Sequence, residues 1–101
     1  MELRHLRYFL AVAEELHFAR AAERLHIEQS PLSRAIRELE EELGAQLFVR
    51  TSRSTRLTLA GKLLMENAPR VLLALDQARE SVKAAANGFH GRLRVALSDG
   101  I

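Results

Sequence analysis

Apolar residues recur at helical spacing along the first part of the chain, in three separate runs. The first covers residues 2–16 and the second covers residues 18–25, each with apolar side chains three and four positions apart. The third covers about residues 29–43, with Pro31 in its first turn and Gly44 suited to end it. This pattern predicts three helices, the second and third joined by a tight turn.

The next stretch, residues 46–58, changes to two short strand-like segments around a polar tip at residues 51–55. Thr58 can cap a following helix, which we expect from Leu59 to Asn87. The elements together predict a mainly α fold. It is a winged helix-turn-helix with a small β-hairpin wing and a long C-terminal dimerisation helix.

The helix expected at residues 59–87 carries a sustained heptad seam. Its members are Leu64, Ala68, Val71, Leu75, Ala78, Val82 and Ala85. Such a helix is longer than a small domain needs, so the seam predicts pairing with a second copy of the chain. The alternative is an amphipathic helix that packs only on its own core. Pro69 lies beside the seam and is expected to kink or loosen the helix there.

After Asn87 the pattern changes again, because Leu93, Val95 and Leu97 alternate with polar or small residues. Alternation of this kind predicts the start of a strand. A lone strand is not stable, so we expect residues 88–101 to open a further domain. The predicted organisation is therefore a winged helix-turn-helix over residues 1–58, a linker helix over 59–87 and this third segment.

Composition and motifs narrow the possible functions. The chain has no cysteine, which removes disulfides, thiolate metal sites and a cysteine nucleophile. No apolar run approaches the roughly 18 residues of a membrane span, and the charged N-terminus lacks a signal-peptide pattern. The histidines lack metal-ligand spacing, and Ser30 and Ser33 lack the glycine-flanked turn of a hydrolase nucleophile. We expect a cytoplasmic protein that is not an enzyme and uses no metal or cofactor.

Charge is distributed unevenly, and its distribution points to a polyanion. Between Leu43 and Met65 the chain has basic residues but no acid. On the third helix the glutamates lie at residues 38–42, interpreted as a solvated face, while the first half is polar or basic. Because carboxylates repel phosphates, the first half is predicted to enter a DNA major groove. Arg53, at the hairpin tip, suits a narrow minor groove.

These residues together resemble the LysR-type transcriptional regulators of bacteria. The shared pattern runs through LRYF, AAERLHIEQSPLSRAIRELEEELGAQLFVR, the wing arginine and LTLAG. The resemblance implies a linker helix that dimerises antiparallel and a C-terminal effector domain that binds a small-molecule inducer. It also implies tetramers of the full-length protein on DNA. Residues 88–101 would then begin a truncated effector-binding domain.

Carried onto this sequence, the resemblance implies a set of residues that contact double-stranded DNA. Residues placed to contact bases or backbone are Gln29, Ser30, Pro31, Ser33, Arg34 and Arg53. Residues placed to contact phosphate are Arg37, Arg50, Thr51, Ser52 and Arg56. The chain departs from the family pattern at three positions. His17 is a poorer helix cap than the usual Ser or Asn, and Ala19 replaces a polar residue that often touches the backbone. Glu28 stands where Ser or Thr often caps the third helix; it suits the helix dipole but would repel a nearby phosphate.

Two other functions compete with a sequence-reading regulator. One is a ligand-independent architectural winged-helix protein, which would bind most duplexes alike. The other is a helical module that binds only proteins, against which the basic wing argues.

Overall fold

The computed structural model describes the backbone of residues 1–98 and the side chains of residues 1–88. Its elements, in chain order, are α1 (Leu3–Glu15), α2 (Phe18–Leu25), α3 (Gln29–Leu43), β1 (Phe48–Arg50), β2 (Thr55–Leu57) and α4 (Leu59–Ser98). The described part of the chain contains no helix long and apolar enough to cross a membrane. The mainly α, winged helix-turn-helix fold predicted from the sequence is confirmed.

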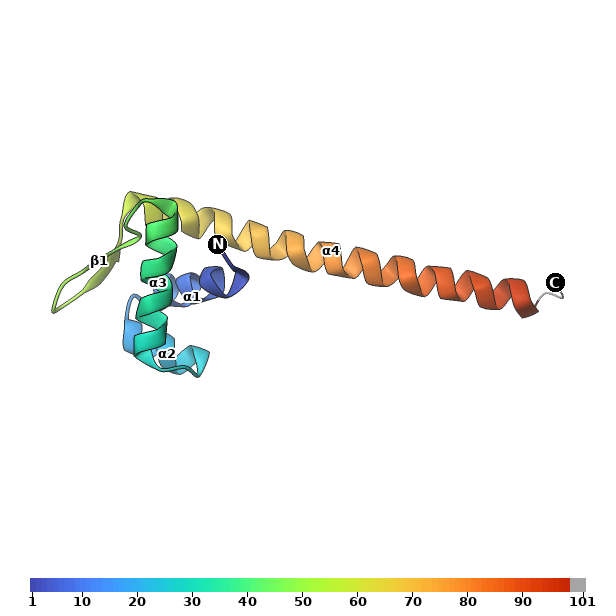
Figure 1. Ribbon diagram of the computed structural model, residues 1–101, viewed down its shortest axis with the longest axis horizontal. Helices are drawn as coiled ribbons and strands as arrows, with labels where there is room; N and C mark the ends of the chain where they lie inside the picture. Colours follow the sequence, from blue (N-terminus) through green and yellow to red (C-terminus); the bar gives the residue numbers. More distant parts are fainter. Residues whose placement is uncertain (99–101) are drawn as a thin grey trace. The chain divides into compact units, whose positions relative to one another are not determined.

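The chain forms two compact units, Met1–Pro69 and Arg70–Ile101. In the first unit α3 contacts both α1 and α2, and the β1–β2 hairpin extends to one side of the three helices (Figure 1). The boundary between the units falls at Pro69, inside α4. The expected loosening at this proline does not end the helix.

The core of the first unit is built from the predicted apolar faces of the helices. Its largest fully buried side chains are Phe9, Val12, Leu32, Leu39 and Leu47. Phe48, the first residue of β1, joins this core because its ring packs against two aromatic neighbours. It lies 5.4 Å from the ring of Phe9 and 5.8 Å, edge to face, from the ring of Phe18. The hairpin is therefore tied to the helices through one aromatic cluster.

Each of the first three helices ends in a residue with left-handed backbone conformation. Leu16 ends α1 with φ 50°, His26 ends α2 with φ 58° and Gly44 ends α3 with φ 68°. The turn after α2 is closed by a hydrogen bond in which the N–H of Ile27 donates to the carbonyl oxygen of Ala22 at 3.0 Å. Short, hydrogen-bonded turns of this kind hold α2 and α3 in a defined crossing.

The hairpin is antiparallel, and its register pairs Phe48 with Leu57 and Arg50 with Thr55. Thr58 follows β2 and caps α4, as predicted, because its Oγ1 accepts the N–H of Gly61 at 3.0 Å. The N–H of Thr58 donates to the carbonyl oxygen of Leu47 at 3.0 Å. The start of α4 is thus bonded directly to the segment that enters β1.

The prediction for residues 88–98 is wrong in this structure. The strand expected around Leu93, Val95 and Leu97 is helical, because α4 continues from Leu59 to Ser98 instead of ending at Asn87. A strand needs a neighbouring strand to satisfy its backbone groups, and residues 88–98 have none beside them in the hairpin sheet. A helix satisfies those groups within its own segment. The remaining positions of the predicted third segment, 99–101, lie outside the described residues.

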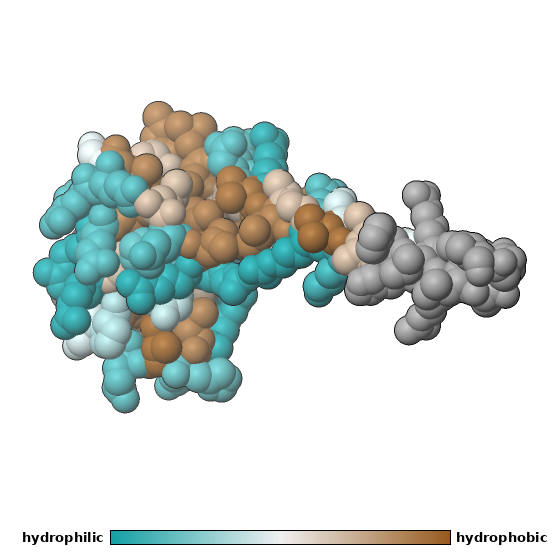
Figure 2. Space-filling model, turned by 45° about the vertical axis from the view of Figure 1, so that its right-hand side comes forward, coloured by the Kyte–Doolittle hydropathy of each residue, from teal (hydrophilic) through white to brown (hydrophobic). Residues whose placement is uncertain are grey.

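Figure 2 shows hydrophobic residues, in brown, at the surface of the chain, and several hydrophobic side chains that are open to solvent belong to α4. In the first unit they are Leu59 and Leu63, and in the second they are Val71, Leu73 and Val82. Val82 keeps 69% of its surface exposed. Apolar side chains repeated along one helix without cover are typical of a surface that pairs with another chain.

Candidate nucleic-acid interface

The first half of α3 presents a polar face to solvent. Helical spacing buries Leu32, Ala35 and Ile36 on the inner side of this helix. The same spacing leaves five predicted contact residues of α3 exposed on the outer side and Ser33 half-buried. The exposed residues are Gln29, Ser30, Pro31, Arg34 and Arg37. A helix that is anchored on one face and polar on the other is suited to reading a groove.

The predicted residues of α3 meet the wing in one surface depression. It is lined by Gln29, Ser30, Ser33, Arg34, Arg37 and Arg50. Five of these belong to α3 and the last to β1, so residues far apart in sequence converge on one place. Hydroxyl, amide and guanidinium groups gathered in this way supply hydrogen-bond donors for phosphate and base edges.

The tip of the wing is closed by the Thr51 side chain. Its Oγ1 accepts the N–H groups of Arg53 at 3.3 Å and Ser54 at 3.0 Å, and the N–H of Thr51 donates to the Ser54 carbonyl oxygen at 2.8 Å. The Thr51 hydroxyl, predicted from the family resemblance as a phosphate contact, thus also shapes the tip. The exposed Arg53 side chain is carried on a hydrogen-bonded turn.

A second depression connects the wing tip with the start of α3. Gln29 and Arg50 line it together with the tip residues Thr51, Ser52 and Arg53. Arg56 lies elsewhere. It lines a separate, mainly apolar depression with Leu16, Val49, Leu57 and Lys62. The structure therefore brings the wing tip and α3 together and leaves Arg56 outside that cluster.

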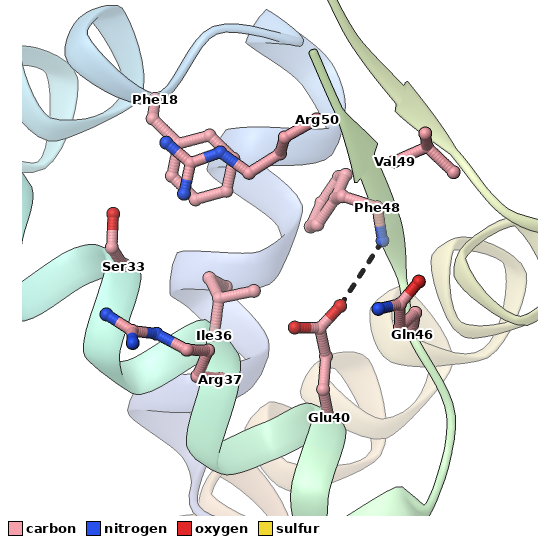
Figure 3. Close-up of a pocket in the computed structure, with 9 residues that line it drawn as sticks. All are labelled: Phe18, Ser33, Ile36, Arg37, Glu40, Gln46, Phe48, Val49 and Arg50. Carbon is pink, nitrogen blue, oxygen red and sulfur yellow. Dashed lines mark hydrogen bonds between the residues drawn. The ribbon is translucent and has the colours of Figure 1, made fainter.

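Arg50 is held in place by an aromatic ring. Its guanidinium carbon lies 3.7 Å from the centroid of the Phe18 ring, and the two planes overlap in Figure 3. Phe18 is the first residue of α2 and is buried in the core. Phe18 begins the apolar run predicted over residues 18–25, and the family resemblance implies that Arg50 contacts phosphate, but neither pattern indicates that the two side chains touch.

Glu40 has a structural role that the sequence interpretation missed. Its carboxylate Oε2 accepts the backbone N–H of Leu47 at 2.7 Å and that of Phe48 at 3.4 Å (Figure 3). The expectation that the glutamates at 38–42 are only a solvated face is therefore wrong for this residue. No sequence signal could reveal these bonds, because both N–H groups that donate to the Glu40 carboxylate belong to the backbone and are independent of residue type.

Two other glutamates of that run also have partners. The Glu38 carboxylate lies 3.4 Å from Nε2 of the buried His5, and Glu42 pairs with the amino group of Met1. The first contact joins the second half of α3 to α1, on which His5 lies, and the second joins it to the residue at the start of the chain, before α1. The acidic half of α3 is therefore tied to its own domain.

Replacing Glu40 with alanine is expected to destabilise the domain by about 1–3 kcal/mol. The buried N–H of Leu47 would lose its charge-assisted bond, and an unsatisfied buried donor costs about that much. The free energy of unfolding, measured in urea by circular dichroism, tests this. Glu41→Ala, on the exposed face of the same turn, is the control and should change stability by no more than about 0.5 kcal/mol. Equal effects of the two substitutions would contradict the anchoring role.

The two departures in helix capping have different outcomes. His17 caps α2 despite its unusual side chain, because its Nδ1 accepts the N–H of Arg20 at 3.1 Å. Glu28 precedes α3 and makes no capping bond through its side chain. The exposed N-terminal N–H groups of α3 are consequently not covered by the Glu28 carboxylate.

The predicted dimer seam divides into covered and open positions. Ala68 is fully buried and Leu64 packs against the core of the first unit, so their own chain covers them. The half-buried Leu75 lies in the second unit. The exposed members of the seam are Val71, Ala78, Val82 and Ala85. Because Leu64 and Ala68 are already covered by their own chain, the part of the seam that a second copy could contact begins at Val71.

Comparison with known proteins gives the chain a family. Residues 3–62 match the family described as bacterial regulatory helix-turn-helix protein, lysR family. The uncharacterized HTH-type transcriptional regulator YnfL of Escherichia coli (strain K12) is 49% identical over 98 residues, which cover 97% of this chain and 33% of that protein. The HTH-type transcriptional regulator AlsR of Bacillus subtilis (strain 168) is 48% identical over 97 residues, covering 96% and 32%. The chain thus spans about one third of the length of these relatives.

Solved structures agree with this assignment. The BenM DBD/catB site 1 DNA complex is 50% identical with a TM-score of 0.79, and the match covers 85% of this chain and 96% of that one. The CbnR DBD–DNA complex is 43% identical with a TM-score of 0.83, covering 85% and 99%. The resemblance predicted from the sequence is confirmed. The chain belongs to the lysR family of bacterial regulatory helix-turn-helix proteins.

Proposed function

We propose that this chain is the DNA-binding part of a transcriptional regulator that reads a specific operator. The first half of α3 enters the major groove, and the tip of the β1–β2 wing, led by Arg53, enters the adjacent minor groove. Arg37, Arg50 and the wing hydroxyl groups contact phosphates, while Gln29 and Arg34 contact base edges.

The convergence of α3 and β1 on one polar depression carries this proposal. The depression contains three guanidinium groups, from Arg34, Arg37 and Arg50. Its amide and hydroxyl groups can form the directional hydrogen bonds that base recognition needs. The similar solved structures of BenM and CbnR domains in complex with DNA support the same function.

The proposal includes a homodimer formed through α4. The exposed apolar side chains from Val71 to Val82 on this helix support it, because they would be covered by a second copy. A twofold-symmetric dimer matches an inverted-repeat operator. In the full-length protein, a C-terminal domain beyond α4 would bind a small-molecule inducer, and full-length copies would assemble as tetramers in the cytoplasm.

Selection from random DNA followed by fluorescence anisotropy tests the function. The chain should enrich an inverted repeat, bind it more tightly than a scrambled duplex, and lose affinity as salt rises because phosphate contacts release counterions. A ligand-independent architectural protein would enrich no sequence and bind both duplexes equally. Absence of binding to either duplex at low salt would contradict DNA binding by this chain.

Arg34→Ala is expected to relax sequence preference. A bidentate arginine contact to a base is worth about 1–3 kcal/mol of discrimination, so the ratio of specific to scrambled affinity should fall accordingly. Arg37→Ala, one turn later on the same helix, is the matched control and should weaken binding to both duplexes alike. If Arg34→Ala also lowers both affinities equally, Arg34 contacts phosphate and not a base.

A further inference from the structure

We propose that Phe18 is a positioning residue, whose ring holds the Arg50 guanidinium ready for a DNA phosphate before DNA arrives. The proposal rests on the proposed function. It adds that part of the affinity is set by a buried aromatic side chain that does not touch the nucleic acid.

The Phe18 ring forms a fixed platform. It is buried, with 5% of its surface exposed, and it makes an edge-to-face contact with Phe48. Phe48 is in turn packed on Phe9 in the core. The Arg50 guanidinium carbon lies 3.7 Å above the centre of this platform. The flat guanidinium group can keep its N–H donors at its edge while one face is stacked on a ring.

The backbone of Arg50 is fixed as well. Arg50 is the last residue of β1, where it pairs with Thr55. The beginning of the same strand is anchored by the Glu40 carboxylate. Both ends of the side chain, the backbone and the guanidinium, are therefore held by the folded domain.

The neighbours of the guanidinium suit a phosphate. Arg50 also lines a third depression, whose lining includes Ser33, Arg37 and Glu40, and Figure 3 shows these polar side chains around the same opening. The acidic residue of this depression is Glu40, whose carboxylate is bonded to backbone N–H groups of the β1 segment. An anion that enters here meets a hydroxyl and two guanidinium groups.

Holding Arg50 in advance should raise affinity without adding a contact. A free arginine side chain loses rotamer entropy when it binds, and a side chain that is already ordered loses less. Removal of the platform should therefore weaken DNA binding about three- to tenfold, the range expected for one immobilised long side chain. The number of phosphates contacted, and hence the dependence of affinity on salt, should stay the same.

A double-mutant cycle on a fixed mixed-sequence duplex tests this. Phe18→Leu, Arg50→Gln and the double variant are titrated by anisotropy at several salt concentrations, after circular dichroism has shown each to be folded. Phe18→Leu should weaken binding about three- to tenfold with an unchanged salt slope. Arg50→Gln should reduce the slope by about one contact, and Phe18→Leu should then cause no further loss. Leu6→Ala, which removes a buried apolar side chain of α1 outside the aromatic cluster, is the control and should leave binding unchanged.

Arg50→Lys tests the same stacking contact by a substitution at an exposed residue, which leaves the core unchanged. Lysine keeps the charge but cannot stack as a plane. Arg50→Lys should therefore lose as much affinity as Phe18→Leu, and its salt slope should equal that of the unmodified chain. Full affinity of Arg50→Lys, or an equal effect of Phe18→Leu with and without Arg50, would overturn the proposal. Failure of the unmodified chain to bind the duplex would instead overturn the proposed function itself.

Discussion

Replacing Gly61 with alanine is expected to destabilise the first unit by about 3 kcal/mol or more, the upper end of the range for overpacking a rigid site. A Cβ atom at this position would lie 2.2 Å from the carbonyl oxygen of Leu47 and 2.8 Å from a methyl carbon of Leu57. The oxygen belongs to the backbone and accepts the N–H of Thr58, so it cannot move without breaking the bond that joins α4 to the wing. The midpoint of urea unfolding should fall sharply.

The control for this prediction is Gly88→Ala. Gly88 also lies in α4, but a Cβ atom there would meet nothing within 4 Å. Alanine in an exposed helix is more stable than glycine by about 1 kcal/mol, so this substitution should leave stability unchanged or raise it slightly. If both variants unfold at the same urea concentration as the original chain, α4 does not approach the wing as closely as described.

Replacing Leu75 with glutamate is expected to split the dimer and to lower affinity for an inverted-repeat operator by about 100-fold. The substitution puts a charge on the proposed seam, which then cannot be covered by a second copy. A monomer binds one half-site and loses the effective concentration that joins two DNA-binding units. Light scattering should report half the mass, and anisotropy should report the weaker binding.

Leu73→Glu is the control, because it shows whether the dimer is lost through a charge on the seam or through a charge at any apolar position of α4. Leu73 lies on the same helix, two residues before Leu75, and is 57% exposed. Its position is outside the heptad pattern, so the same substitution should leave the mass unchanged. A monomer produced by Leu73→Glu, with a dimer retained by Leu75→Glu, would place the pairing surface on a different face of α4.

Elements whose formation depends on local pattern could be predicted from the sequence. The periodicity of apolar residues gave α2 and α3 their bounds, and Thr58 and Gly44 were recognised as caps because their roles need only near neighbours. The alternation around Val95 misled, since a strand depends on a partner that local sequence does not supply. For the same reason the end of α4 was placed too early.

Most of the predicted contact residues lie together in the structure and Arg56 does not, whereas the contacts that support them could not be predicted from the sequence. The exposed polar residues of α3 follow from the helical pattern, and the wing arginines follow from their place in the hairpin. Glu40 and Phe18 act through contacts between elements, one with backbone N–H groups and the other with a guanidinium. Such contacts depend on how the elements pack, and a linear pattern of residue types carries no record of them.

The bond from Glu40 to the start of β1 has a consequence for the operator. Because one carboxylate fixes the wing to α3, the distance between the two reading elements is set by the protein before it meets DNA. The spacing between α3 and the wing would then be the same in the free domain and in the domain bound to DNA. In the proposed complex, a duplex would have to bring its major groove and its adjacent minor groove to that spacing, so local twist and groove width between the two positions would become part of what is selected.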